Sequence, residues 1–229
     1  MTRFSFEVPI AHLETFEDLQ DFHFALSMLF AEGRYKNFYS NLPRNKEVWL
    51  DNSFNEQERA DESSTLVRLA RDYHIDKVVC PDALDWDEKR ICSSYQYMNV
   101  HLPSERLVTV VNSSEMLQYV KDNTSCRQFA CAYRMRRKHL YADLEWTREC
   151  HFLGLNGPNE LIYLQPPSCD TGMPIKLAIM HKSYFDWVRE GFTHADTTWM
   201  PGYFNYVMSD REIQIARDNI KRLKEFVNG

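Results

Sequence analysis

Glycine is scarce in this sequence, and its seven residues form no phosphate-binding loop. Neither the G-x-G-x-x-G pattern of dinucleotide-binding folds nor the P-loop pattern G-x-x-x-x-G-K-S/T occurs. Both patterns need glycine because the backbone must approach a phosphate group closely. The sequence therefore argues against a Rossmann dinucleotide site and against a P-loop nucleotide site.

Metal-binding patterns are also lacking. The six cysteines form no C-x-x-C pair, and no cluster of cysteine and histidine has the spacing of zinc ligands. Several cysteines lie inside apolar runs, where cysteine behaves as a small hydrophobic residue. We therefore expect free thiols in a reducing cytoplasm, no metal and no cofactor.

Long apolar runs are absent as well. No run approaches the roughly 18–20 residues needed to cross a membrane. The first segment, MTRFSFEVPIAHLETFEDLQ, lacks the apolar core of a signal peptide. We expect a cytoplasmic protein that makes no membrane contact.

The net charge of −6 excludes a generally basic nucleic-acid binder but leaves room for a local basic groove. The strongest basic cluster consists of Arg134, Arg136, Arg137 and Lys138. Such a run is either a solvated helix face or a set of phosphate contacts, which position a strand without reading its sequence.

Short apolar segments alternate with helical patterns along the chain. Segments rich in Val, Ile, Phe and Cys predict buried strands at residues 4–9, 48–51, 77–80, 107–111, 128–133, 151–155 and 176–180. Helical patterns occupy residues 15–30, 56–73, 113–121, 135–145 and 210–227. This alternation implies parallel βαβ units.

The number of these units predicts an α/β fold, a single (β/α)8 TIM-like barrel domain over residues 1–229, compact or irregular. An open flavodoxin-like sheet is the alternative. The length suits a barrel, because such domains commonly have about 250 residues. The 14 Phe, 12 Tyr and 5 Trp residues mark the chain as globular.

Acidic residues follow three strand-like segments. Asp51 ends one segment, Asp82 and Asp85 follow the next, and Asp170 ends another before Thr-Gly-Met-Pro. Each has a structural alternative, because aspartate also caps helices and suits turns. Together these acids would meet at the mouth of a barrel, where catalytic groups lie at the C-terminal ends of the strands.

Carboxylates around one barrel mouth suit chemistry at the anomeric carbon of a glycoside. One carboxylate attacks or stabilises an oxocarbenium-like centre, and another exchanges a proton with the leaving group. Phe54 and Trp86 stand beside these acids in the sequence and would supply an aromatic face. A third carboxylate would accept hydrogen bonds from a donor-rich base such as guanine.

The order of these motifs resembles that of the tRNA-guanine transglycosylase superfamily, and more closely its DNA-modifying branch, the DpdA proteins of phages and bacteria. The resemblance covers roughly residues 45–180. It is carried by DNSFNE from Asp51, by CPD ending at Asp82, and by FLGLNGPNEL followed by SCDTGMP, which contains Asp170.

The chain departs from the family pattern in three places. Ser53 and Phe54 replace a glycine pair in the first motif, and a Gln-Gly after a middle strand is missing. No cysteine follows Cys169, so the family's zinc site is absent. The missing zinc ligands point away from ordinary tRNA enzymes and toward a compact DNA-modifying relative.

The resemblance implies a glycosyltransferase that exchanges guanine in DNA for a 7-deazaguanine derivative, such as the 7-cyano form. Asp170 would be the nucleophile of a covalent intermediate, and Asp51 would be the acid and base. Asp82, or else Asp85, would hold the base edge. The implied substrate-binding residues are Asp82, Asp85, Phe54, Glu56, Trp86 and Gly154.

The implied partners are DNA, whose target nucleotide leaves the stack, and a free 7-deazaguanine base. We also expect a homodimer and a location in a bacterial or phage-infected cytoplasm. Three alternatives stay open: a tRNA-guanine transglycosylase, a hydrolytic nucleoside or base N-glycosidase, and a non-catalytic partner subunit. The last is the least favoured, because Asp170 is retained.

Overall fold

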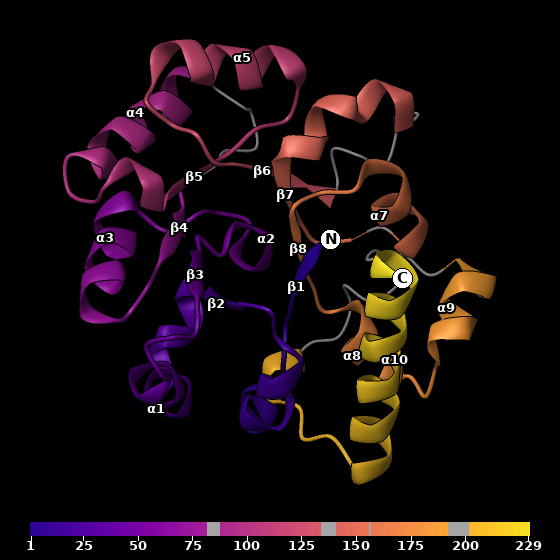
Figure 1. The fold of residues 1–229 in the computed structure, drawn as a ribbon. Coiled ribbons are helices and arrows are strands. Elements are labelled where there is room, and N and C mark those ends of the chain that lie inside the picture. The colour runs from indigo at the N-terminus through magenta and orange to yellow at the C-terminus, as the bar shows by residue number, and fades with distance from the viewer. Residues whose placement is uncertain (82–87, 134–140, 156, 192–201) are drawn as a thin grey trace. The chain divides into compact units, whose positions relative to one another are not determined.

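The structure, a computed structural model, describes residues 1–229 except 82–87, 134–140, 156 and 192–201. Its eight strands are joined by helices (Figure 1). This is the organisation of a (β/α)8 TIM-like barrel, as the sequence predicts. The chain divides into two compact units, a terminal unit of Met1–Asp21 with Tyr133–Gly229 and a central unit of Phe22–Ala132. The expected single domain over residues 1–229 stays a prediction.

The terminal unit contains the first strand and the last two: β1 (Arg3–Phe6), β7 (Cys150–Leu153) and β8 (Ser168–Thr171). β8 pairs in parallel with β1 on one side and with β7 on the other. Pairing of the first strand with the last belongs to a barrel. A flavodoxin-like sheet instead places its first strand between the second and the third.

The central unit contains five strands that pair in chain order, each parallel to the next. Their residues are buried almost throughout, as expected for parallel strands that are covered on both faces. These strands are β2 (His23–Leu26), β3 (Val48–Asp51), β4 (Lys77–Val79), β5 (Leu107–Val110) and β6 (Phe129–Ala132).

Helices of the α type follow most strands. Those of the central unit are α1 (Gly33–Asn41), α2 (Phe54–Gln57), α3 (Ser63–Asp72), α4 (Glu88–Asn99) and α5 (Ser114–Asn123). Those of the terminal unit are α7 (Pro158–Leu164), α8 (Met173–Ile179), α9 (Tyr184–Glu190) and α10 (Asp210–Asn228). Short 3-10 helices are η1 (Ile10–His12), η2 (Glu14–Leu19), η3 (Ser27–Ala31), η4 (Ser104–Arg106), η5 (Tyr141–Glu149) and η7 (Tyr203–Asn205).

The terminal helix α10 begins where its sequence predicts. Ser209 and Glu212 form a capping box, in which each side chain bonds the backbone N–H of the other residue. The helix runs beside α8 and α9 (Figure 1). Its buried Asn219 donates hydrogen bonds to the carbonyls of Pro174 and Lys182, which tie α10 to both ends of α8.

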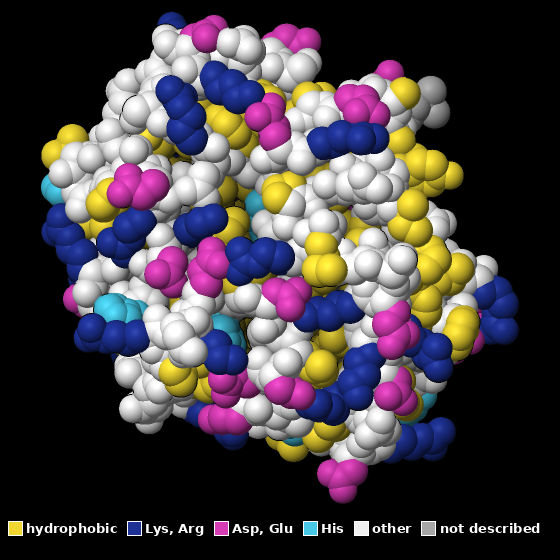
Figure 2. Space-filling model, viewed as in Figure 1, with side chains coloured by type: hydrophobic (Ala, Val, Ile, Leu, Met, Phe, Trp, Pro, Cys, Tyr) yellow, Lys and Arg dark blue, Asp and Glu magenta, His cyan; other side chains and the backbone are white. Residues whose placement is uncertain are grey.

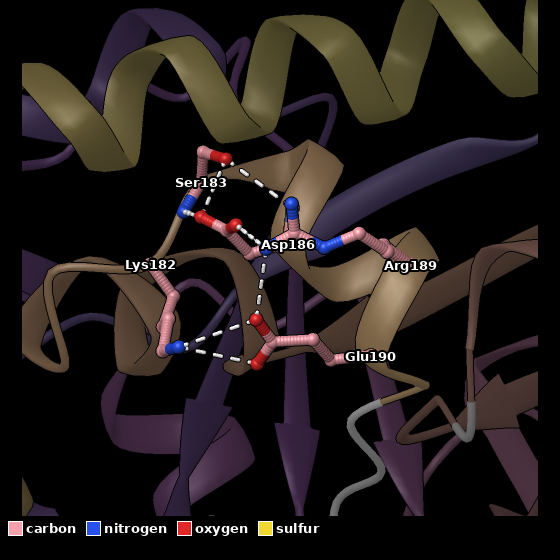
Figure 3. A network of polar contacts seen from close by, with 5 residues as sticks. All are labelled: Lys182, Ser183, Asp186, Arg189 and Glu190. Atoms are coloured by element: carbon pink, nitrogen blue, oxygen red, sulfur yellow. Dashed lines mark hydrogen bonds and ion pairs between the residues drawn. The ribbon is translucent and has the colours of Figure 1, made fainter.

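The same device starts α9 (Figure 3). Ser183 and Asp186 form its capping box, and Arg189 donates to Asp186 Oδ1 at 2.8 Å. Lys182 bonds Glu190 at 3.1 Å across the helix. These side chains lie at the surface, so we expect only a small contribution to stability from each ion pair.

The surface mixes charges of both signs, and Figure 2 shows Lys and Arg side chains interspersed with Asp and Glu on the face that it draws. Among the described residues, no helix is both long enough and apolar enough to cross a membrane.

Three predicted elements are wrong. The helix predicted over residues 56–73 is divided into α2 and α3 by residues 58–62, which are not helical. Residues 15–30 form η2, β2 and η3 rather than one helix, because the apolar run of β2 pairs with β3. Residues 176–180 belong largely to α8 rather than to a strand. Pro174 stands in the first turn of this helix, where proline is tolerated because backbone N–H groups at that position have no acceptor within the helix. Short apolar runs do not distinguish a buried strand from a buried helix by periodicity.

Candidate active site

Asp170 lies near the C-terminal end of β8, the end at which barrel enzymes carry their catalytic groups. The residue is 4% exposed, so nearly all of its surface is covered. The register places it opposite Ser5 of β1 and Leu153 of β7. The strand continues through Thr171 and α8 begins at Met173, and both residues are buried, so the turn that the sequence offered as an alternative is not a surface turn and the carboxylate itself belongs to the strand.

The Asp170 carboxylate is bound by groups of β7 and the loop after it. His151 Nε2 lies 3.0 Å from Asp170 Oδ1, and the backbone N–H of Gly154 donates to the same oxygen at 3.4 Å. The other ring nitrogen of His151, Nδ1, lies 2.9 Å from Ser168 Oγ. Oδ1 thus makes both hydrogen bonds of the Asp170 side chain, and no described residue bonds Oδ2.

Burial and hydrogen bonding act on Asp170 in opposite directions. Burial raises the pKa of the Asp170 carboxyl above its usual value, and the His151 hydrogen bond pulls that pKa down. The nearby Glu7 raises the pKa further, and the Gly154 N–H lowers it. An ionised Asp170 only accepts hydrogen bonds, so His151 must then carry a proton on Nε2.

A second buried pair adjoins the Asp170 segment. Lys176 Nζ lies 3.4 Å from Glu7 Oε2, and both side chains are nearly covered. Tyr203 donates its hydroxyl to the Glu7 carbonyl at 2.6 Å, and its ring faces Lys176 Nζ. A Cβ at Gly172 would lie 2.7 Å from Glu7 Oε2, so the Glu7 side chain would have to shift to admit one.

Gly154 adopts a backbone conformation that other residues disfavour, with φ of 71°. A Cβ at this position would lie 3.0 Å from Tyr133 Cδ1. The glycine therefore lets the chain turn after β7 while its N–H points to Asp170. The predicted substrate-binding residue Gly154 thus contacts the predicted nucleophile.

Asp51 ends β3 in the central unit and is 8% exposed. Its Oδ2 accepts the backbone N–H of Ser53 at 2.8 Å, which is an Asx-type bond to the residue two positions on. Asn52 does the same for Phe54 at 2.9 Å. Asn52 also donates to the carbonyl of Cys80 at 2.8 Å. Asp51 therefore has the structural role that the sequence offered as an alternative, because its carboxylate shapes the turn that leads into α2.

Ser53 adopts the left-handed conformation that glycine favours, with φ of 56°. Its hydroxyl lies 2.9 Å from Ser27 Oγ and accepts the N–H of Met28 at 3.1 Å. Ser27 in turn donates to Asp61 at 2.6 Å. These buried hydrogen bonds stabilise the left-handed backbone at Ser53, a conformation that residues other than glycine disfavour.

Some of the other predicted site residues lie in the described part of the chain, and the rest lie outside it. Phe54 and Glu56 lie in α2, and Phe54 is 7% exposed, so its ring is packed within the central unit. Asp170 and Gly154 lie together in the terminal unit. Seven residues lie outside the described ranges: Asp82, Asp85, Trp86, Arg134, Arg136, Arg137 and Lys138.

Sequence reasoning missed His151, Ser168, Glu7 and Lys176. The signal for two of them was a polar residue inside an otherwise buried strand, His151 in CHFL and Ser168 in SCDT. Ser168 and Asp170 share one strand face because side chains two apart point the same way.

All six cysteines lie in the described ranges; they are buried, and none forms a disulfide bond. The described residues contain no group of three His, Cys, Asp or Glu side chains suited to hold a metal ion. No family model matches the chain, and no curated protein matches it.

Proposed function

We propose that this chain is a guanine transglycosylase that exchanges guanine in DNA for a 7-deazaguanine base. The observation that carries the proposal is the Asp170 carboxylate, buried at the C-terminal end of a barrel strand with one oxygen held and the other unbonded among the described residues. A carboxylate presented in this way suits attack at an anomeric carbon.

In the proposed reaction, Asp170 attacks C1′ of the target nucleoside as the bond from C1′ to guanine N9 breaks. Asp51 gives a proton to the departing guanine, and a covalent glycosyl ester of Asp170 remains. Asp51 then takes the proton of the incoming 7-deazaguanine, whose nitrogen attacks C1′ and displaces the Asp170 carboxylate. Two displacements at C1′ retain its configuration.

Base recognition and strand binding complete the proposal. Asp82, or else Asp85, holds the base edge, while Phe54 or Trp86 stacks on it and Glu56 adjoins it. The cluster Arg134, Arg136, Arg137 and Lys138 contacts phosphate groups, which would make binding weaken with salt. These roles rest on the family resemblance.

The test is an incorporation assay with labelled guanine and labelled 7-cyano-7-deazaguanine on DNA and on tRNA. The proposal expects label in DNA, and label in tRNA alone would move the activity to the tRNA branch. Release of guanine without any acceptor base would identify a hydrolytic N-glycosidase. Label in neither polymer and no released guanine would overturn the proposal and leave the partner-subunit alternative.

A matched pair of variants separates chemistry from folding. Asp170→Asn removes the proposed nucleophile but keeps a carbonyl oxygen for the His151 contact. Asp186→Asn changes an aspartate of the surface network in Figure 3. We expect incorporation to be lost in the first variant and kept in the second.

A further inference from the structure

We propose that His151 is the positioning residue of the nucleophile, holding Asp170 by Oδ1 so that Oδ2 is the attacking oxygen. This inference rests on the proposed function. His151 was not among the residues that the sequence pattern or the family resemblance selected, and the structure places it in direct contact with Asp170.

The geometry is a bridge across one strand face. The His151 ring lies between Ser168 and Asp170, with contacts of 2.9 Å and 3.0 Å to their side chains. The three residues are 1%, 5% and 4% exposed, respectively. Buried polar groups are costly unless they are paired. The two contacts therefore hold the His151 ring in one orientation, and the ring in turn holds the Asp170 carboxylate.

The positions of Ser168 and Asp170 along β8 indicate which of them reacts and which anchors the His151 ring. Asp170 lies closer than Ser168 to the C-terminal end of β8, where barrel enzymes react. Ser168 begins the same strand, so its hydroxyl is the anchor at the far side of the ring. The hydroxyl can donate to Nδ1 while Nε2–H donates to Asp170, which fixes the tautomer.

A Ser-His-Asp set also raises the possibility of a serine nucleophile. In that triad the serine bonds the nitrogen that removes its proton, and the aspartate orients the ring from the opposite side. Here the serine stands at the N-terminal start of the strand, away from the end at which barrel enzymes react, so the geometry favours the carboxylate as the reacting group. The variants below separate the two possibilities.

Charge at the site supports the same assignment. The groups that act on the Asp170 carboxyl are His151 from β7, Glu7 after β1 and the Gly154 N–H, and Glu7 is itself paired with Lys176 from α8 and bonded by Tyr203 through its carbonyl. Burial and Glu7 favour the neutral carboxylic acid, whereas the hydrogen bond from His151 favours the carboxylate that must attack. Removing His151 should therefore raise the pKa of Asp170.

The experiment measures incorporation of labelled 7-cyano-7-deazaguanine into DNA from pH 5 to 9 for the wild type, His151→Phe and His151→Gln. Phenylalanine fills the space without a hydrogen bond, while the glutamine amide N–H can still donate to Asp170. We expect His151→Phe to lower kcat by about 100-fold, as a misplaced reacting group does. KM should change little, and the acidic limb of the profile should move to higher pH.

His151→Gln should recover most of kcat, which a role in stability alone would not explain. Ser168→Ala should retain activity at a reduced kcat; complete loss in this variant, with Asp170→Asn active, would make Ser168 the nucleophile and overturn the inference. A His151→Phe protein with wild-type kcat and pH profile would overturn it as well.

A readout without turnover covers variants that are hard to assay. In protein labelled with ¹³C at aspartate carboxyl groups, the resonance lost in Asp170→Asn identifies Asp170, and its titration midpoint should rise in His151→Phe. An unchanged midpoint would contradict the inference. Absence of incorporation by the wild type would instead overturn the proposed function, so the two failures are distinguishable.

Discussion

Asp51 and Asp170 both lie at the C-terminal ends of buried parallel strands, yet the fold holds their carboxylates differently. Asp51 bonds the backbone two residues ahead of it, within its own turn. Asp170 is bound by His151 and Gly154, which come from the neighbouring strand and its loop. The local hydrogen bond of Asp51 shapes the backbone of the turn after β3. The contacts of Asp170 with the neighbouring strand and its loop orient the Asp170 side chain and form no turn of its own segment.

This difference divides the two acids by role. Replacement of Asp51 should disturb both a turn and a proton transfer, while replacement of Asp170 should disturb the chemistry without destabilising the fold. Nucleophile and acid can then be told apart by the ratio of activity lost to stability lost.

The largest effect is expected for Asp170→Asn. Incorporation should fall by on the order of 10⁴-fold or more, because an amide does not form the glycosyl ester. Incorporation kinetics with labelled base provide the measurement, and a folded variant with full activity would move the nucleophile elsewhere.

Asp51→Asn should have a smaller effect, about 100-fold on kcat, because general acid and base catalysis is lost while the amide oxygen still accepts the Ser53 N–H. Asp51→Ala removes the turn bond as well and should also lower the melting temperature. Wild-type kcat in Asp51→Asn with a destabilised Asp51→Ala would show that Asp51 serves only the turn.

Gly154→Ala should destabilise the protein by about 1–3 kcal/mol, because the left-handed backbone disfavours a side chain and the new Cβ would meet Tyr133. Gly33→Ala is the matched control: Gly33 begins α1 without a positive φ, and no described residue lies near its Cβ position, so a change within about 1 kcal/mol is expected. Denaturant unfolding of both variants gives the comparison. Equal stability would contradict the strain at Gly154.

The smallest effects are expected in the pH dependence of stability, and they have opposite signs. The folded-state pKa of Asp170 is raised by burial, so stability falls as pH rises from the unfolded pKa through the folded pKa. Asp170→Asn should therefore be more stable than the wild type at neutral pH, with the gain shrinking in acid.

Asp186 behaves in the reverse sense. Its pKa is lowered by hydrogen bonds from the Ser183 backbone and side chain, so its contribution to stability is present above the unfolded pKa and lost as pH falls through the folded pKa. Asp186→Asn should be slightly less stable at neutral pH only. Thermal unfolding between pH 3 and 8 measures both variants, and slopes of the same sign would contradict the contrast.

Sequence patterns predicted the features that depend on neighbouring residues in the chain. The starts of α5 and α10, where Ser113 caps the first helix and Ser209 forms the capping box of the second, lie within one residue of the predicted starts. The parallel strands followed from buried apolar runs. The position of Asp170 at a strand end was likewise predicted, although residues 176–180 were assigned to a strand in place of α8.

The contacts of Asp170 could not be predicted in this way. His151 reaches Asp170 only because β7 and β8 are adjacent in a particular register, and register depends on the packing of the whole sheet. Lys176 reaches Glu7 across most of the chain length for the same reason. The covalent role of Asp170, in contrast, is a matter of chemistry, and one measurement tests it directly.

That measurement is mass spectrometry of the protein quenched with denaturant during turnover on guanine-containing DNA. The account predicts a base-free deoxyribosyl adduct, still part of the DNA strand, on the peptide that contains Asp170. It should be present in the wild type, lost in Asp170→Asn and discharged by added 7-cyano-7-deazaguanine. Incorporation into DNA with the adduct on another residue, or an adduct that survives in Asp170→Asn, would contradict it.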